Sequence, residues 1–143
     1  MKYDEIDAKL LDLLAENARE SVTALARKLG LARTTVQARI ERLETTGSIA
    51  GYTLRRGAKA RPPLRATVLI SIEPRTGPAV LARLKLLSAV EQVQTTSGRW
   101  DLIAILSAPT TEALDETLDD IGAAKGVKSS ESLIHLSTKI DRS

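Results

Sequence analysis

The chain has 143 residues, of which 43% are hydrophobic and 27% charged, and its net charge is +3. This composition is typical of a soluble protein with one compact domain or two small ones. The absence of cysteine excludes disulfides, thiol nucleophiles and zinc knuckles, and an aromatic content of 2% argues against a base-stacking surface. We see no signal peptide and no apolar run near the roughly 18 residues of a membrane-spanning helix, so we expect a cytoplasmic protein without a membrane partner.

The charge is distributed unevenly along the chain. Residues 1–20 carry three basic residues against six acidic ones, and residues 62–143 carry nine against ten. Residues 21–61 hold nine basic residues and only two acidic ones. A basic segment joined to a neutral remainder is typical of a module that binds a polyanion, although a solvated surface gives the same pattern.

Two short helices are predicted at the start of the chain. Asp4 is a suitable N-cap for the first, whose apolar stripe fades at Asn17. Ser21 can cap the second, over residues 22–29, and Gly30 can adopt the left-handed conformation that ends it.

A third helix is predicted over residues 32–46, with Val36, Ile40 and Leu43 inward and Gly47 at its end. Two helices joined at a glycine, the second with small polar and basic residues outward, match a helix-turn-helix that binds double-stranded DNA. Small side chains let the helix lie deep in a major groove, and arginines reach phosphates or guanine edges. A three-helix core without a DNA role would show the same spacing of apolar residues and the same glycine turn. The expected DNA-binding residues are Arg33, Thr34, Thr35, Gln37, Ala38, Arg39 and Arg42.

A domain boundary is predicted near residue 60. Residues 48–54 form a β-prone segment, and a polar linker follows in which Pro62 and Pro63 prevent a helix from crossing the junction. We therefore expect a DNA-binding domain over residues 1–54, a linker over 55–63 and a second domain over 64–143.

The second domain alternates between strand and helix patterns. The element order βαββαβ is ferredoxin-like, so the fold class is α+β: a three-helix, winged-helix-like helix-turn-helix domain joined to a ferredoxin-like domain. Gly98 and Arg99 give a hairpin signal between the second and third strands. The expected strands cover residues 64–73, 90–97, 100–107 and 127–140, and the helices cover 78–88 and 109–124.

Three stretches carry a resemblance to a known family. YDEIDAKLLDLL, LARKLGLARTTVQARIERLETTGSIAGYTL and, in the second half, SGRWDLIAIL resemble the Lrp/AsnC (feast/famine) transcriptional regulators, over nearly the whole chain. The resemblance implies an N-terminal helix-turn-helix that binds DNA and a C-terminal domain that forms homodimers and higher assemblies, commonly octamers. It also implies that this domain binds an amino acid or similar metabolite near the turn between its second and third strands.

Gly98 and Asp101 match the Gly-x-x-Asp signature of that family, with Arg99 and Trp100 between them, so these four are the expected effector-binding residues. Backbone N–H groups beside Gly98 can meet a carboxylate, Arg99 can pair with it, and Asp101 can accept from an α-ammonium group. The same residues also fit a plain hairpin, in which Gly98 makes the turn, Asp101 caps the loop and Trp100 packs on a subunit neighbour.

The chain departs from the family pattern in two places. Ala32 stands where Ser or Thr is usual, which removes an N-cap worth about 1 kcal/mol from the third helix. Residues 55–57 replace the usual Leu-Asp-Pro-like ending of the first domain. The change at Ala32 supports an alternative function: a metabolite-sensing oligomeric protein with weak or no DNA binding.

Enzymes and RNA-binding modules are the other classes to consider. His135 is the sole histidine and no cysteine accompanies it, so we expect no catalytic residue, no metal site and no cofactor. An RNA-recognition module of the same βαββαβ order stacks bases on aromatic residues of its central strands, which here hold only Trp100. We therefore expect a transcriptional regulator whose dimer places two third helices in successive major grooves about 34 Å apart.

Overall fold

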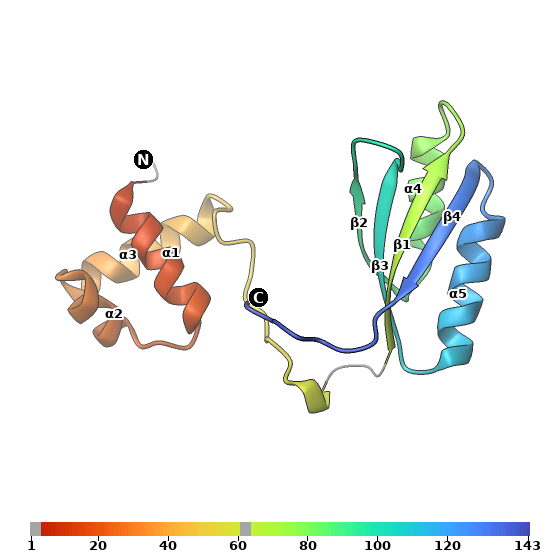
Figure 1. Cartoon of the computed structure of the whole chain (residues 1–143). Coiled ribbons are helices and arrows are strands. Elements are labelled where there is room, and N and C mark those ends of the chain that lie inside the picture. Colours follow the sequence, from red (N-terminus) through yellow and green to blue (C-terminus); the bar gives the residue numbers. More distant parts are fainter. Residues whose placement is uncertain (1–3, 61–63) are drawn as a thin grey trace. The chain divides into compact units, whose positions relative to one another are not determined.

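The computed structural model describes residues 4–60 and 64–143 (Figure 1). The chain divides into two compact units after Arg55, and each has its own buried core. Among the described residues, no helix combines the length and apolar character that crossing a bilayer requires.

The first unit contains three helices, as the sequence predicts: α1 (Glu5–Glu16), α2 (Val22–Leu29) and α3 (Arg33–Thr45). The Ser21 hydroxyl accepts the Ala24 N–H at 3.1 Å, and Gly30 ends α2 in the left-handed region at φ +67°. Ala32 makes no side-chain cap for α3. The helices enclose a core of Leu10, Leu14, Leu25, Ala26, Val36 and Leu43.

The expected β-prone segment after α3 does not form a strand. Residues 50–57 have no regular secondary structure, and a single 3-10 turn, Ala58–Ala60, follows them. The segment is held by contacts with the helices instead: the Tyr52 hydroxyl donates to the Glu44 carboxylate at 3.2 Å, and Arg55 donates to the Glu16 carbonyl at 3.4 Å. A strand needs a paired neighbour, and none lies beside this segment in the described part of the chain.

The second unit has the predicted βαββαβ order. Its elements are β1 (Leu64–Ile72), α4 (Gly77–Lys85), β2 (Val90–Thr95), β3 (Leu102–Ala108), α5 (Thr111–Ala123) and β4 (Val127–Ile134). The strands form one antiparallel sheet in the order β2-β3-β1-β4. Alternate residues of β1 and β3 are buried, which places one face of the sheet against the core that α4 and α5 complete (Figure 1).

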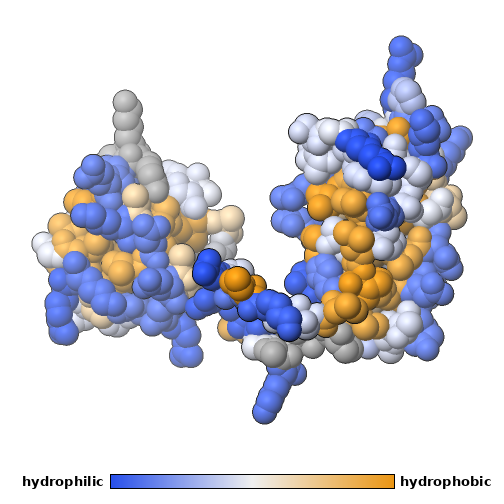
Figure 2. All heavy atoms as spheres, in the orientation of Figure 1, coloured by the Kyte–Doolittle hydropathy of each residue, from blue (hydrophilic) through white to orange (hydrophobic). Residues whose placement is uncertain are grey.

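The opposite face of the sheet carries half-buried apolar side chains. Leu69, Ile103 and Ile105 share this face by strand register, and Leu133 of the edge strand joins them with 49% of its surface exposed. Hydrophobic side chains gather over the sheet in Figure 2. An apolar face of this kind is typical of a sheet that meets a partner.

Strand ends differ from the prediction most at the end of β4 and around the loop between β2 and β3. The last strand ends at Ile134, not at residue 140, because its partner β1 begins at Leu64. Ile134 pairs with Ala66, and the His135 N–H makes the last backbone bond, to the Arg65 carbonyl at 2.9 Å. β2 ends at Thr95 and β3 starts at Leu102, so the β2–β3 hairpin has a loop of residues 96–101 instead of a two-residue turn.

Candidate nucleic-acid interface

The outward surface of α3 is the candidate DNA-binding surface. The glycine turn at Gly30 and the buried Val36 and Leu43 fix which side of α3 meets the core. Five of the seven expected residues are exposed on the other side, and their side chains are short or polar: Arg33, Thr34, Thr35, Gln37 and Ala38. This surface can enter a major groove with little steric hindrance from its own side chains.

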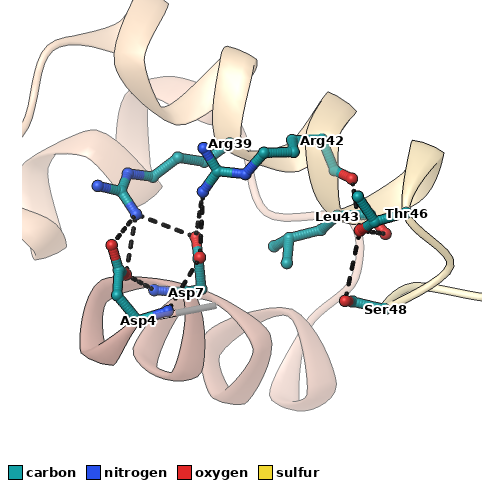
Figure 3. A network of polar contacts seen from close by, with 7 residues as sticks. All are labelled: Asp4, Asp7, Arg39, Arg42, Leu43, Thr46 and Ser48. Atoms are coloured by element: carbon teal, nitrogen blue, oxygen red, sulfur yellow. Dashed lines mark hydrogen bonds and ion pairs between the residues drawn. The ribbon is translucent and has the colours of Figure 1, made fainter. Parts of the chain in front are cut away.

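Arg39 and Arg42 do not point outward, so the expectation for their orientation is wrong. The Arg39 guanidinium donates to both carboxylate oxygens of Asp4 at 2.9 Å and to Asp7 at 3.1 Å. Arg42 donates to the Asp7 carboxylate at 3.1 Å (Figure 3). Only 18% and 19% of these two arginine side chains is exposed, and the Asp7 side chain is 1% exposed. A carboxylate buried this deeply requires cationic partners, which draws both arginines toward α1.

The same acidic pair caps α1. Asp4 accepts the Asp7 N–H at 2.9 Å, and the Asp7 carboxylate accepts the Asp4 N–H at 3.2 Å. The Asp7 N–H and then the Arg39 guanidinium lower the pKa of the Asp4 carboxyl, while the two carboxylates raise the pKa of Arg39. We call Asp4, Asp7, Arg39 and Arg42 the α1–α3 ion network.

Sequence reasoning from helix caps and charge missed this network, although a signal for it exists. Asp7 lies three residues before Leu10 and seven before Leu14, so it occupies the apolar stripe of α1. A carboxylate on a buried stripe predicts a cation on the facing helix.

The outward face of α3 also carries a carboxylate that is not among the seven residues expected to bind DNA. Glu41 is exposed, and its Oε1 accepts a hydrogen bond from the Gln37 amide at 3.3 Å. These two side chains lie one helical turn apart on the same surface as Thr34 and Ala38.

The four expected effector residues lie together in the loop between β2 and β3. Gly98 has φ +109°, a conformation that favours glycine, and a Cβ built there meets no atom within 4 Å. The Arg99 guanidinium lies over the Trp100 ring, 5.4 Å from its centroid. The backbone around this loop is therefore open to a small molecule.

Asp101 stabilises the end of the sheet. Its carboxylate accepts the Ile72 N–H at 2.9 Å, and its own N–H donates to the Ile70 carbonyl at 2.9 Å. These bonds tie Asp101 to β1 and extend the β1–β3 pairing by one residue beyond Leu102.

The described residues contain no candidate metal site. No group of three or more His, Cys, Asp or Glu side chains is arranged there to hold a metal ion. A ring nitrogen of His135 lies 2.7 Å from the Thr67 hydroxyl on the sheet.

Comparison with known proteins identifies both units. Residues 4–44 match the AsnC-type helix-turn-helix domain, and residues 65–143 match the Lrp/AsnC ligand binding domain. The HTH-type transcriptional regulator LysM of Sulfurisphaera tokodaii is 31% identical over 134 residues, which cover 93% of this chain and 94% of that protein.

Solved structures agree with these matches. A feast or famine regulatory protein from M. tuberculosis, complexed with L-methionine, is 30% identical with a TM-score of 0.85 over 97% of this chain and 95% of that one. AsnC of E. coli has a TM-score of 0.86 over 100% of this chain and 98% of that one, and at 24% identity it shows the fold. The sequence resemblance is confirmed: this chain belongs to the Lrp/AsnC family of transcriptional regulators.

Proposed function

We propose that the chain regulates transcription by laying the outward face of α3 in the major groove of double-stranded DNA. The exposed row of small and polar side chains at Thr34, Gln37 and Ala38 is the observation that carries this proposal. At 1.5 Å per residue, the 13 residues of α3 extend roughly 20 Å, which is enough to cross a groove while the opposite side packs on the core.

The arginines of α3 have two different roles. Arg33 is exposed at the first turn of α3, where it can reach a phosphate, as we expected for it. Arg39 and Arg42 lie beside the DNA-facing surface, and we propose that their first task is to hold α3 against α1. Any phosphate contact they make must compete with the aspartates, Asp4 and Asp7 for Arg39 and Asp7 for Arg42, to which they already donate.

The effector is proposed to be an amino acid bound at Gly98, Arg99, Trp100 and Asp101. The relative from M. tuberculosis complexed with L-methionine supports this class of ligand. The open backbone at Gly98 suits a carboxylate, and the Arg99 guanidinium adds a cation beside it.

Assembly and location complete the proposal. The apolar open face of the sheet supports a homodimer, and we propose that dimers assemble further into octamers. Such a dimer presents two copies of α3 to successive major grooves. We assign the chain no catalytic step, and we place it in the cytoplasm together with its DNA.

Selection from a randomised duplex library by the full chain tests DNA binding. We expect enrichment of a two-fold symmetric site. Ala38→Glu, which puts a carboxylate into the groove, is expected to weaken binding to that site at least tenfold, while Ala15→Glu on the exposed side of α1 leaves it within twofold. Failure of the full chain to enrich any sequence at about 50 mM salt would overturn the proposal and leave metabolite sensing alone.

A thermal-shift screen with the twenty amino acids, run beside a measurement of solution mass, tests effector binding and assembly. A true effector raises the stability of the form it binds by about 2.7 kcal/mol at a hundredfold excess over Kd. We expect Gly98→Val to lose the shift, because a side chain at φ +109° strains the loop and covers its open backbone. A shift that survives Gly98→Val places the ligand elsewhere.

A further inference from the structure

We propose that Glu41 determines sequence specificity by accepting a hydrogen bond from the exocyclic amine of a base, in the first place cytosine, in the major groove. This inference rests on the proposed function, because it assigns a role to one more residue of the same α3 surface.

Glu41 lies on the groove-facing surface, in the second half of α3. Residues 34, 38, 41 and 45 follow one another at helical spacing along one side of α3, and all four are exposed. The arginines that flank this side, Arg39 and Arg42, are turned toward Asp7. The charge in this row is therefore that of the Glu41 carboxylate.

The Gln37–Glu41 hydrogen bond prepares both side chains for base contacts. One N–H of the Gln37 amide donates to Glu41 Oε1 at 3.3 Å. The second N–H and the carbonyl oxygen of that amide are the donor and acceptor that pair with adenine N7 and N6. The Glu41 carboxylate keeps further acceptor positions directed to the same side.

A carboxylate in the major groove discriminates strongly among bases. Guanine presents two acceptors in the major groove, and thymine presents a keto oxygen and a methyl group. Neither base offers the Glu41 carboxylate a hydrogen-bond donor, and their acceptor oxygens and nitrogen repel it. The amines of cytosine and adenine are the available donors, and adenine places the acceptor N7 next to its amine. Cytosine N4 is thus the best partner, and the unfavourable bases are rejected by repulsion.

The spacing of the pair limits where this cytosine lies. Four residues of helix advance about 6 Å, whereas one base pair advances about 3.4 Å. The base contacted by Glu41 therefore lies one or two base pairs from the base contacted by Gln37.

The test compares full-length Glu41→Gln with the wild-type chain in the same library selection, and then measures Kd for duplexes that carry each of the four bases at the assigned position. Glu44→Gln is the matched control: it removes the same charge from the same helix, but the Glu44 carboxylate accepts from the Tyr52 hydroxyl at 3.2 Å. Melting of both variants checks that the exposed substitutions leave the fold intact.

We expect the wild-type chain and Glu44→Gln to prefer cytosine over guanine at one position by about tenfold or more, and Glu41→Gln to lose most of that preference. Adenine is expected to rank second in the wild-type series. The inference would be overturned if Glu41→Gln selected the same motif as the wild-type chain. It would also be overturned if the base preference lost in Glu41→Gln were one for guanine or thymine, or if Glu44→Gln lost the cytosine preference to the same extent. These results leave DNA binding standing, whereas a wild-type chain that enriches no motif removes the proposed function itself.

Discussion

Replacement of Asp7 by asparagine is expected to loosen α3 from α1. Removing one partner of a fully buried ion pair costs about 3–5 kcal/mol. The Asp7 side chain is 1% exposed, but the Arg39 and Arg42 side chains are 18% and 19% exposed, so water partly solvates them after the substitution. The expected loss for Asp7→Asn is therefore about 2–3 kcal/mol, below the fully buried range.

This loss is large for a unit of this size. A domain of about 55 residues is stable by roughly 3–8 kcal/mol, and each 1 kcal/mol shifts its Tm by about 4–8 °C. Melting of the full chain should therefore show the transition of the first unit lowered by about 10–20 °C. Hydrogen exchange should rise in α1 and α3 while β1 and β3 keep their protection, because the two units have separate cores.

Asp12→Asn is the matched control, since Asp12 is an exposed carboxylate on the same helix. We expect it to change stability by less than about 0.5 kcal/mol. A double-mutant cycle of Asp7→Asn with Arg42→Gln should give a coupling energy of at least about 0.5 kcal/mol. If Asp7→Asn behaves like Asp12→Asn, the α1–α3 ion network does not hold the helices together.

Three further changes test other parts of the molecule. The Asp7 N–H and the Arg39 guanidinium lower the pKa of the Asp4 carboxyl below its ordinary value of 3.8. The stability that Asp4 contributes is therefore complete above pH 3.8 and is lost as the pH falls through the lowered pKa. Acid unfolding of Asp4→Asn should lack this pH-dependent loss of stability. Ala32→Ser should stabilise α3 by about 1 kcal/mol in urea unfolding, because it supplies the missing N-cap; no gain would mean that α3 is capped by other means. Gly126→Ala should destabilise the second unit by about 1–3 kcal/mol, since the residue has φ +99° and its Cβ would lie 2.7 Å from Thr76 Cβ; an unchanged Tm would show that the turn adapts.

Local signals in the sequence were sufficient for the positions of most elements. Ser21 and Gly30 mark the ends of α2 because a cap acts on neighbouring backbone groups. The period-two pattern of β1 and β3 arises because one face of the sheet is buried. These features depend on residues close in the chain or on a single buried face.

The errors share a different cause, which is dependence on a distant partner. Residues 48–54 have strand propensity but no paired strand in the described chain, and β4 stops opposite the start of β1, where Ile134 pairs with Ala66. Arg39 was assigned outward from the spacing of α3 alone, whereas its orientation is decided by Asp4 and Asp7 more than thirty residues away. Asp101 likewise bonds to Ile72 on another strand, which no hairpin pattern specifies.

Alkylation of a single thiol on α3 tests the central claim most directly, since the chain contains no cysteine of its own. The thiol of Ala38→Cys lies on the exposed side of α3, and that of Ala123→Cys lies exposed on α5 as a control. With the DNA site that the wild-type chain selects, we predict strong protection of the α3 thiol and an unchanged rate at the α5 thiol. An α3 thiol that reacts equally fast with and without saturating DNA would contradict the account.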